Sequence, residues 1–303
     1  MTRACPSPSA MTTVAVTGPL GFIGGRVVAS LTAAGAATRG LVRRDPPADA
    51  AFQAVRGDLA DRDGLAALVR GADAVVHTAS SIGADENEAR AVNVEGTRAV
   101  VAAAGAVGLP VLYVSTASVF GSGPHRGSPR DGATPESPTS RTRLEAERIV
   151  LEAAGAVVHP NVVYGAGDRW LFPGAYRLVT AVGVMPATDA RVSAIHVQDL
   201  GRVVAGAALT GRTGVVPVHT APPVTAQALI AATFDAFGAP LPEVVPVSEF
   251  RERAAGRGLG AHHLAMLLED AWFDVRDPDP AGVVTLTDAD RAWYAGIARG
   301  LRP

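Results

Sequence analysis

The segment Thr17–Gly24, with the sequence Thr-Gly-Pro-Leu-Gly-Phe-Ile-Gly, constrains the fold of this 303-residue chain more than any other feature. A short β-branched run, Thr12–Thr17, precedes it, and a largely apolar stretch, Phe22–Ala34, follows it and stops at Gly35. A β-branched run is typical of a strand, and an apolar stretch that stops at a glycine is typical of a helix. We therefore predict a glycine-rich turn between the first strand and the first helix.

The three glycines of this turn have separate physical roles. Gly18 and Gly21 allow a tight turn and close approach of the backbone to a pyrophosphate, and Gly24 permits close packing of helix against sheet. The helix N-terminus offers unpaired N–H groups to an anion. Because the turn joins a strand to a helix, a dinucleotide site is favoured over a purely structural turn. The expected contacts from this turn are Gly18, Leu20, Gly21, Phe22, Ile23 and Gly24.

Strand and helix patterns alternate along the following part of the chain. Further strands are expected at Thr38–Val42, Phe52–Arg56, Ala74–Thr78, Pro110–Ser115 and Ala156–His159, and helices at Gly64–Val69, Ala84–Val107 and Thr139–Ala153. This alternation predicts an α/β fold with a Rossmann-type, doubly wound parallel sheet that has helices on both faces.

Two features interrupt the alternation. Gly121–Pro138 contains eleven Gly, Pro or Ser among 18 residues, so we expect a long loop of the kind that binds or covers ligands. After Tyr164 the pattern becomes irregular and all three tryptophans occur, which indicates a smaller, mostly helical substrate cap.

The expected domain organisation has three parts. A flexible tail occupies 1–11, with Met11 as an alternative start, and an NADP-binding Rossmann domain occupies 12–165. Residues 166–303 form mainly the cap, with a return to the Rossmann domain near 190–220.

Composition excludes several functional classes. The net charge is −2 with both signs scattered along the chain, so neither nucleic acid nor a membrane surface is an expected partner. The single Cys5 excludes a disulfide framework, and no apolar run approaches the roughly 20 residues of a membrane span. All 27 basic residues are arginine, so chemistry that requires a lysine amine is excluded. A cytoplasmic protein that binds a small molecule is expected, either as a monomer or as a homodimer.

The end of the second strand bears on the choice of cofactor. Arg43, Arg44 and Asp45 occupy the region where an acidic residue would bind the ribose hydroxyls of NAD. Two guanidinium groups suit a 2′-phosphate, because arginine pairs with phosphate in a bidentate manner. NADP (NADPH) is therefore expected, although Asp45 serving the ribose, or the arginines lying in a solvated loop, are alternatives.

Further motifs give the chain a resemblance to the short-chain dehydrogenase/reductase superfamily, in its extended, epimerase-like branch. They occur in the family's order and span about 185 residues: TGPLGFIG at 17–24, GDL at 57–59, VVHTAS at 75–80, NVEGT at 93–97, VSTASVFG at 114–121, PNVVYGAGDR at 160–169 and IHVQDLGR at 195–202. The resemblance implies cofactor contacts from Asp58, Leu59, Thr78, Ala79, Ser80, Asn93, Pro160, Asn161 and Val162. It also implies that Thr116 hydrogen-bonds the substrate oxygen.

The chain departs from this family at the catalytic pair. The family carries a tyrosine and, four residues later, a lysine on the helix after the long loop, where this chain has Thr139 and Arg143. A missing general acid typically lowers the rate by about 10²–10⁴. An aliphatic hydroxyl is a poor acid near pH 7, and arginine cannot relay protons. We nevertheless take Thr116, Thr139 and Arg143 as the candidate catalytic residues, with Arg143 able to hold the ribose.

Other polar and aromatic residues have two interpretations each. His77, His159 and His196 are expected to be packed and hydrogen-bonded rather than catalytic. The aromatic group of Trp170, Phe172 and Tyr176 suits either a core or a stacking wall for a flat substrate. No metal site is expected.

Three functional classes remain. The first is an NADPH-dependent ketoreductase that works without the tyrosine, the second a redox-inactive NADP sensor or regulator, and the third a sugar-nucleotide epimerase or dehydratase. The ketoreductase is favoured because a phenol beside the carbonyl of a polycyclic aromatic polyketide, such as an angucyclinone-like compound, could supply the proton. The exclusive use of arginine indicates a high-GC genome, and high-GC bacteria make many such polyketides in antibiotic biosynthesis.

Overall fold

A computed structural model describes residues 12–83, 85–126, 132–219, 221–259, 261–274 and 281–301. The chain divides into two compact units, each built from separate segments. Unit 1 comprises residues 1–114, 145–157 and 201–216, and unit 2 comprises residues 115–144, 158–200 and 217–303. The expected tail at 1–11 lies outside the described residues, and the functional division at 165 stays a prediction.

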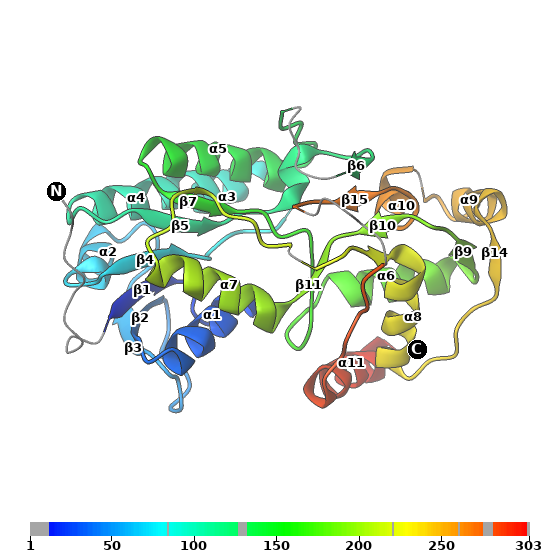
Figure 1. Ribbon diagram of the computed structural model, residues 1–303, viewed down its shortest axis with the longest axis horizontal. Coiled ribbons are helices and arrows are strands. Elements are labelled where there is room, and N and C mark those ends of the chain that lie inside the picture. Colours follow the sequence, from blue (N-terminus) through cyan, green and yellow to red (C-terminus); the bar gives the residue numbers. More distant parts are fainter. Residues whose placement is uncertain are drawn as a thin grey trace. The chain divides into compact units, whose positions relative to one another are not determined.

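Unit 1 contains a seven-stranded sheet with the strand order β12-β7-β5-β4-β1-β2-β3 (Figure 1). The strands are β1 (Thr13–Thr17), β2 (Ala37–Val42), β3 (Gln53–Arg56), β4 (Ala74–His77), β5 (Val111–Val114), β7 (Ala156–Val158) and β12 (Gly214–Val215). Pairs β1–β2, β2–β3, β1–β4 and β4–β5 run parallel. The order reverses direction between β1 and β4, as a doubly wound α/β fold requires, so the predicted fold class is confirmed.

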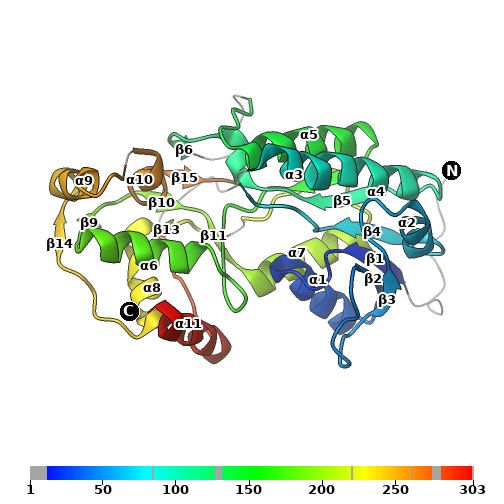
Figure 2. The ribbon, with the colours of Figure 1, turned by 180° about the vertical axis from the view of Figure 1, so that it is seen from behind.

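Helices cover both faces of this sheet (Figures 1 and 2). One face carries α2 (Arg62–Val69), α3 (Glu86–Arg90), α4 (Gly96–Gly105) and α5 (Pro138–Glu152), and the other carries α1 (Phe22–Ala33) and α7 (Val197–Leu209). The predicted helix at Ala84–Val107 is interrupted by one π-helical turn, Ala91–Glu95.

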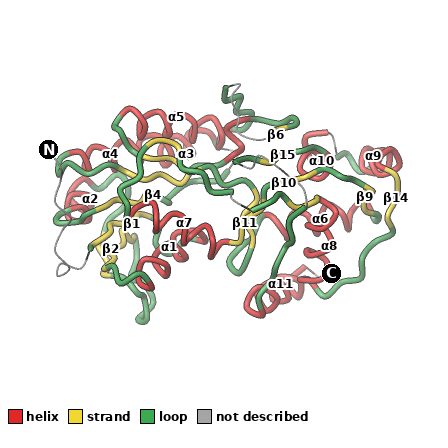
Figure 3. The backbone as a smooth tube through the Cα atoms, in the orientation of Figure 1, coloured by secondary structure: helices red, strands yellow, loops and turns green. Residues whose placement is uncertain are grey.

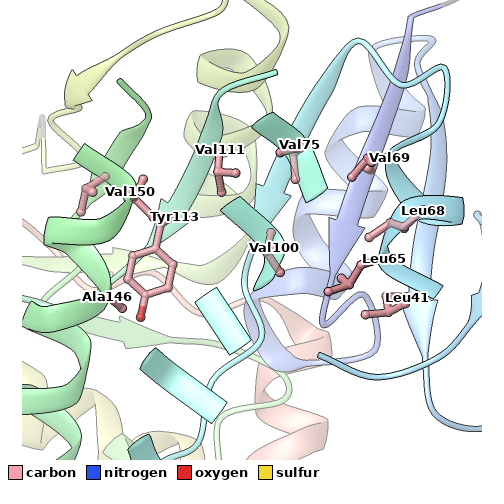
Figure 4. Packing of buried hydrophobic residues seen from close by; sticks show 13 residues of the cluster. Leu41, Leu65, Leu68, Val69, Val75, Val100, Val111, Tyr113, Ala146 and Val150 are labelled. Carbon is pink, nitrogen blue, oxygen red and sulfur yellow. The ribbon is translucent and has the colours of Figure 1, made fainter. Parts of the chain in front are cut away.

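The main apolar cluster of unit 1 lies between the sheet and the α2, α4 and α5 helices (Figure 4). Its buried members include Leu41, Leu65, Leu68, Val69, Val75, Val100, Val111, Tyr113, Ala146 and Val150. They come from successive strands and from helix positions three or four residues apart, which is the pattern that the sequence repeats along this unit.

Unit 2 combines helices with short strands (Figure 3). Its helices include α6 (Leu171–Val182), α8 (Ala226–Phe237), α9 (Val247–Ala255), α10 (Ala261–Leu268) and α11 (Asp288–Leu301), and the 3₁₀ turn η2 spans Ala117–Phe120. Its strands are β6 (His125–Arg126), β8 (Val162–Tyr164), β9 (Met185–Ala187), β10 (Arg191–Val192), β11 (Ala194–His196), β13 (Val224–Thr225), β14 (Val244–Pro246) and β15 (Ala271–Trp272). They form a sheet β13-β10-β15-β6 and the pairs β11–β8 and β14–β9.

The long loop expected over Gly121–Pro138 contains a two-residue strand, β6, that the sequence did not indicate. The backbone N–H of His125 donates to the carbonyl of Asp270 at 2.7 Å, and β6 pairs with β15 in parallel register. The partner strand lies far along the chain, so no local pattern could indicate this pairing. Residues 127–131 of the loop lie outside the description. None of the described helices is long and apolar enough to cross a membrane.

Candidate active site

The glycine turn has the close contacts that its sequence predicts. Gly18 has a φ of +70°, and a Cβ there would lie 2.9 Å from the backbone nitrogen of Ala79. A Cβ on Gly24 would lie 2.0 Å from the carbonyl oxygen of Gly18. The turn is closed by a 3.0 Å hydrogen bond from the Gly21 N–H to the Gly18 carbonyl. Only glycine fits at positions 18 and 24, and the turn opens helix α1 where an anion would meet free N–H groups.

The turn lies at the point where the strand order of the sheet reverses. Strand β1 ends at Thr17 and β4 ends at His77, and the two residues are partners in the parallel register. The Thr78 hydroxyl donates to the Thr17 carbonyl at 2.7 Å. Ligands of open α/β sheets bind at the carboxyl ends of strands beside such a reversal. The segment Thr78–Ser80 therefore lies beside the glycine turn, and its contact with a cofactor stays a prediction.

Asn93 approaches this segment from the π-helical turn. Its side-chain oxygen accepts from the Ser81 N–H at 2.8 Å, and its amide nitrogen donates to the Ser81 carbonyl at 3.1 Å. Both contacts are with the backbone just after Thr78–Ser80. The structure thus places Asn93 as a support of the predicted cofactor segment, and direct contact of Asn93 with the cofactor stays a prediction.

Arg43, Arg44 and Asp45 follow strand β2 and are all exposed. The Asp45 carboxylate accepts from the guanidinium of Arg56 at 2.7 Å. This ion pair gives Asp45 a partner within the protein. The arrangement is compatible with a 2′-phosphate bound by the two arginines, which stays a prediction.

Asp58 and Leu59 follow strand β3. The Asp58 carboxylate accepts from the N–H groups of Ala60 at 2.8 Å and Asp61 at 3.1 Å, which fixes its own turn. Leu59 packs against Gly96 of α4, where a Cβ would lie 2.6 Å from a Leu59 methyl. Both residues belong to unit 1, together with the glycine turn, Thr78–Ser80 and Asn93.

The candidate catalytic residues belong to unit 2. Thr116 begins the 3₁₀ turn η2, and its hydroxyl oxygen accepts from the Ser118 N–H at 3.2 Å. The Arg143 guanidinium is buried and donates through Nη1 to the Ser115 carbonyl at 3.0 Å. Arg143 is thereby linked to the residue that precedes Thr116. Thr139 lies in the first turn of α5 and is half-buried.

Pro160, Asn161 and Val162 join this group. The Pro160 carbonyl accepts from the Ala117 N–H at 2.9 Å, which ties the segment to the residue after Thr116. Val162 is buried at the start of β8. The structure therefore brings together Thr116, Arg143 and the 160–162 segment within unit 2.

His219 is a site residue that sequence reasoning missed. Its Nε2 accepts from the Asn161 N–H at 2.9 Å, while the Asn161 side chain donates to the Ala271 carbonyl at 2.8 Å. Burial lowers the pKa of His219 to about 4, although the nearby negative charge of Asp274 acts to raise it. The imidazole is therefore neutral near pH 7, as an acceptor nitrogen requires. No motif surrounds His219, so only the tertiary structure reveals the contact.

Four buried polar side chains fix the loop after β8. The Asp290 carboxylate accepts from the Ala166 N–H at 2.6 Å and from His196 Nε2 at 3.0 Å. Burial alone would raise the pKa of Asp290, but hydrogen bonds from Thr287 and Ala166 outweigh it and hold that pKa below its ordinary value. The Tyr294 hydroxyl donates to Asp168 at 3.0 Å. We name Asp168, His196, Asp290 and Tyr294 the loop-anchoring network, in which His196 has the structural role expected of it.

The aromatic residues of α6 separate into two groups. Phe172 is buried and stacks on Tyr164 and Tyr294, with centroids 5.7 and 4.8 Å away. Tyr176 stacks on Phe237 with centroids 4.4 Å apart. Phe172 therefore belongs to the core and is unavailable as a stacking wall for a substrate, whereas Tyr176 is half-buried and packs against the core. Trp170 is 67% exposed and has no such ring contact with the residues that the structure describes.

The other histidines have packing contacts. His125 Nε2 lies 3.0 Å from the Gly121 carbonyl, and the ring of His159 lies 5.1 Å from that of Phe120. Within the described part of the chain, no group of three or more His, Cys, Asp or Glu side chains could hold a metal ion.

The parallel sheet, the glycine turn at its reversal point and the supported segment after β4 define a dinucleotide-binding protein. A family model described as the NAD dependent epimerase/dehydratase family matches residues 14–217. This chain belongs to that family.

Curated relatives are named mostly for reductions. The chain is 32% identical to a ceramide reductase of Caulobacter vibrioides over 61% of its length and 57% of the relative. It is also 32% identical to a 4-hydroxy-2-methyl-3-oxo-4-farnesyl-3,4-dihydroquinoline-1-oxide ketoreductase of Stigmatella aurantiaca, over 52% of each. The chain thus spans about half the length of the curated relatives it matches.

Solved structures share the fold. The enzyme WbmH of Bordetella bronchiseptica, in complex with NAD⁺, superposes with a TM-score of 0.70 and 22% identity, covering 97% of this chain and 100% of that one. A UDP-glucuronic acid 4-epimerase of Bacillus cereus, in complex with NAD, gives a TM-score of 0.69 at 16% identity, covering 96% and 99%.

Proposed function

We propose that the protein is an NADPH-dependent ketoreductase that transfers a hydride to a carbonyl of an angucyclinone-like polycyclic aromatic polyketide. The observation that carries this proposal is the link from Arg143 through the Ser115 carbonyl to Thr116. This link ties Thr116, which is predicted to bind the substrate oxygen, to helix α5. Helix α5 also carries Thr139, at the position where the family has its tyrosine. Two relatives named for ketone or ceramide reduction add support.

The residues of unit 1 fit a nicotinamide dinucleotide. At Gly18 and Gly24 a Cβ would collide with Ala79 and with the Gly18 carbonyl, so only glycine lets the turn pack this closely against the segment after β4, as a dinucleotide-binding turn does. The exposed guanidinium groups of Arg43 and Arg44 suit the 2′-phosphate of NADPH, and the helix N-terminus suits the pyrophosphate. When bound, the cofactor supplies the hydride.

Cofactor preference tests this assignment. Charge-assisted hydrogen bonds contribute about 1.5–3 kcal/mol, so we expect NADPH to bind roughly tenfold to a hundredfold more tightly than NADH. Replacing Arg43 and Arg44 with alanine should remove the difference, whereas Arg62→Ala, an exposed arginine at the start of α2, should keep it. Fluorescence titration of both cofactors measures the ratio. Equal affinities in the unmodified protein would refute NADPH preference.

The chain's own residues orient the substrate but do not provide its proton. The Thr116 hydroxyl can hydrogen-bond the carbonyl oxygen, and Arg143, held by the Ser115 carbonyl, stays charged and cannot relay a proton. A phenol beside the carbonyl gives its proton to the oxygen as hydride reaches the carbon. The product is an alcohol, and the phenolate then recovers a proton from water.

A pair of substrates tests the proton source. With NADPH present, we expect reduction of a polycyclic ketone whose carbonyl adjoins a phenol, and much slower reduction of the matching methyl ether, which has no proton to give. NADPH consumption and product mass provide the rates. Thr139→Ala should retain most of the activity, because a general acid would be worth about 10²–10⁴ in rate.

Equal rates on phenol and ether would refute substrate-assisted proton supply. Tight NADPH binding with no turnover of any aromatic ketone would instead favour the alternative of a redox-inactive sensor.

A further inference from the structure

Three side chains form a buried row in unit 1 that the proposed chemistry does not use. His77 is fully buried at the end of β4. Its Nδ1 lies 2.6 Å from the Thr17 hydroxyl, and its Nε2 lies 2.9 Å from the Thr97 hydroxyl on α4. Thr17 and Thr97 are also fully buried. The row thus joins the residue before the glycine turn to the helix that covers the sheet.

Full burial of the His77 ring favours its neutral form, and counting protons in that form assigns a direction to each bond of the row. The Thr97 hydroxyl has one hydrogen, and it donates to the Asn93 carbonyl at 2.6 Å. Its oxygen must therefore accept from His77 Nε2–H. A neutral imidazole carries one N–H, so Nδ1 is an acceptor and the Thr17 hydroxyl donates to it. These contacts assign the neutral Nε2–H tautomer to His77.

The same residues surround the segment after β4. At the start of the segment, the Thr78 hydroxyl donates to the Thr17 carbonyl. At its end, the Asn93 side chain accepts from the Ser81 N–H and donates to the Ser81 carbonyl. The row through His77 connects these two supports, since it begins at Thr17 and ends at the Asn93 carbonyl. The row and these two supports therefore hold both ends of the segment from Thr78 to Ser81.

We propose that His77 is a positioning residue for the nucleotide site. As a fixed Nε2–H tautomer, it keeps the glycine turn and Thr78–Ser80 in the arrangement that binds the dinucleotide. This inference rests on the cofactor half of the proposed function, but not on the substrate or on turnover.

The tautomer is tested directly by NMR of the ring nitrogens in protein labelled at histidine with ¹⁵N. The expected spectrum shows a protonated Nε2 and an unprotonated Nδ1 for His77, assigned by its loss in His77→Asn. A ring with Nδ1–H, or a doubly protonated ring, would overturn the proposal.

Binding of NADPH tests the consequence. Thr17→Val keeps the shape of the side chain but removes the donor to His77, and we expect it to weaken NADPH affinity about tenfold, the effect of one hydrogen bond of ordinary net strength. Thr97→Val should weaken it too, although Thr97 lies at the far end of the row from the glycine turn. Thr17→Ser keeps the hydroxyl and should restore the affinity.

Thr38→Val is the matched control. Thr38 is a buried threonine on the neighbouring strand β2, and its hydroxyl has no hydrogen-bond partner among the described residues. The same chemical change there should leave NADPH affinity unchanged. Circular dichroism establishes that each variant is folded at the temperature of the titration.

If folded Thr17→Val and Thr97→Val bind NADPH as tightly as Thr38→Val does, the row is merely structural and the proposal fails. Loss of ketone reduction with normal cofactor binding would count against the proposed function alone. A protein that binds neither NADPH nor NADH would remove the cofactor assignment and this inference with it.

Discussion

The two units of this protein hold their shape by different means. In unit 1, the strands β1 to β5 have four to six residues and share one sheet with the shorter β7 and β12, and a large apolar cluster lies beneath α2, α4 and α5. In unit 2, strands of two or three residues form three small sheets. Its loops depend on individual polar side chains, such as the Asp290 contact with Ala166, 124 residues away. Unit 2 should therefore be the more sensitive to loss of one polar group.

Asp290→Ala should show the largest effect of this difference. The carboxylate is 1% exposed and accepts hydrogen bonds from Ala166, His196 and Thr287, all of which would lose their acceptor. Removing one member of a buried charged network typically costs about 3–5 kcal/mol. We expect a loss of that size in the free energy of unfolding, measured by urea denaturation.

Asp288→Ala provides the control for this change. Asp288 lies on the same helix, α11, but is exposed in its first turn. Its loss should cost about 0.5 kcal/mol through the helix dipole. Similar costs for both variants would show that the loop-anchoring network does not support unit 2.

A smaller effect is expected from pH, because the buried imidazole of His219 has a lower pKa in the folded protein than in the unfolded chain. His219 supports Asn161 in unit 2, with its pKa lowered to about 4 by burial. The unfolded chain takes up this proton at a higher pH than the folded chain does. The stabilisation is therefore complete above about pH 6.5 and is lost as the pH falls toward 4.

The expected decrease in unfolding free energy over that window is at most about 3 kcal/mol, since one pKa unit corresponds to about 1.4 kcal/mol. His219→Gln can still accept from Asn161 but does not titrate, so its stability should vary less between pH 6.5 and 4. Asp290, whose pKa lies below its ordinary 3.8, loses its contribution only at lower pH. An identical pH dependence in His219→Gln and the unmodified protein would show that His219 is not responsible.

The sequence was sufficient to predict the fold class of unit 1 because most of its signals are local. The glycine turn occurs between a strand pattern and a helix pattern, and Thr17 and His77 end two strands that a doubly wound sheet places side by side. Their hydrogen bond follows from the topology, although its direction required the contacts of Thr97 and Asn93.

Unit 2 could not be predicted in the same way. Asp168 and Tyr294 are 126 residues apart, and nothing in either local pattern indicates the other. The short strand His125–Arg126 lies in a loop rich in glycine and proline, and tertiary pairing with Ala271–Trp272 overrides that composition. His219 has no motif, so its support of Asn161 appears only once the chain is folded.

The division of unit 1 into three segments has a consequence for synthesis on the ribosome. Strand β5, all four residues of which are buried in the finished protein, emerges long before β7, which lies beside it in the sheet, and before β12, which lies beside β7. The nascent sheet therefore has an open apolar edge until the segment near residue 157, and then that near residue 215, leaves the exit tunnel. Helix α11, which carries Asp290 and Tyr294, is translated after the other described elements, so the loop at 165–168 gains these anchors only once α11 has left the exit tunnel.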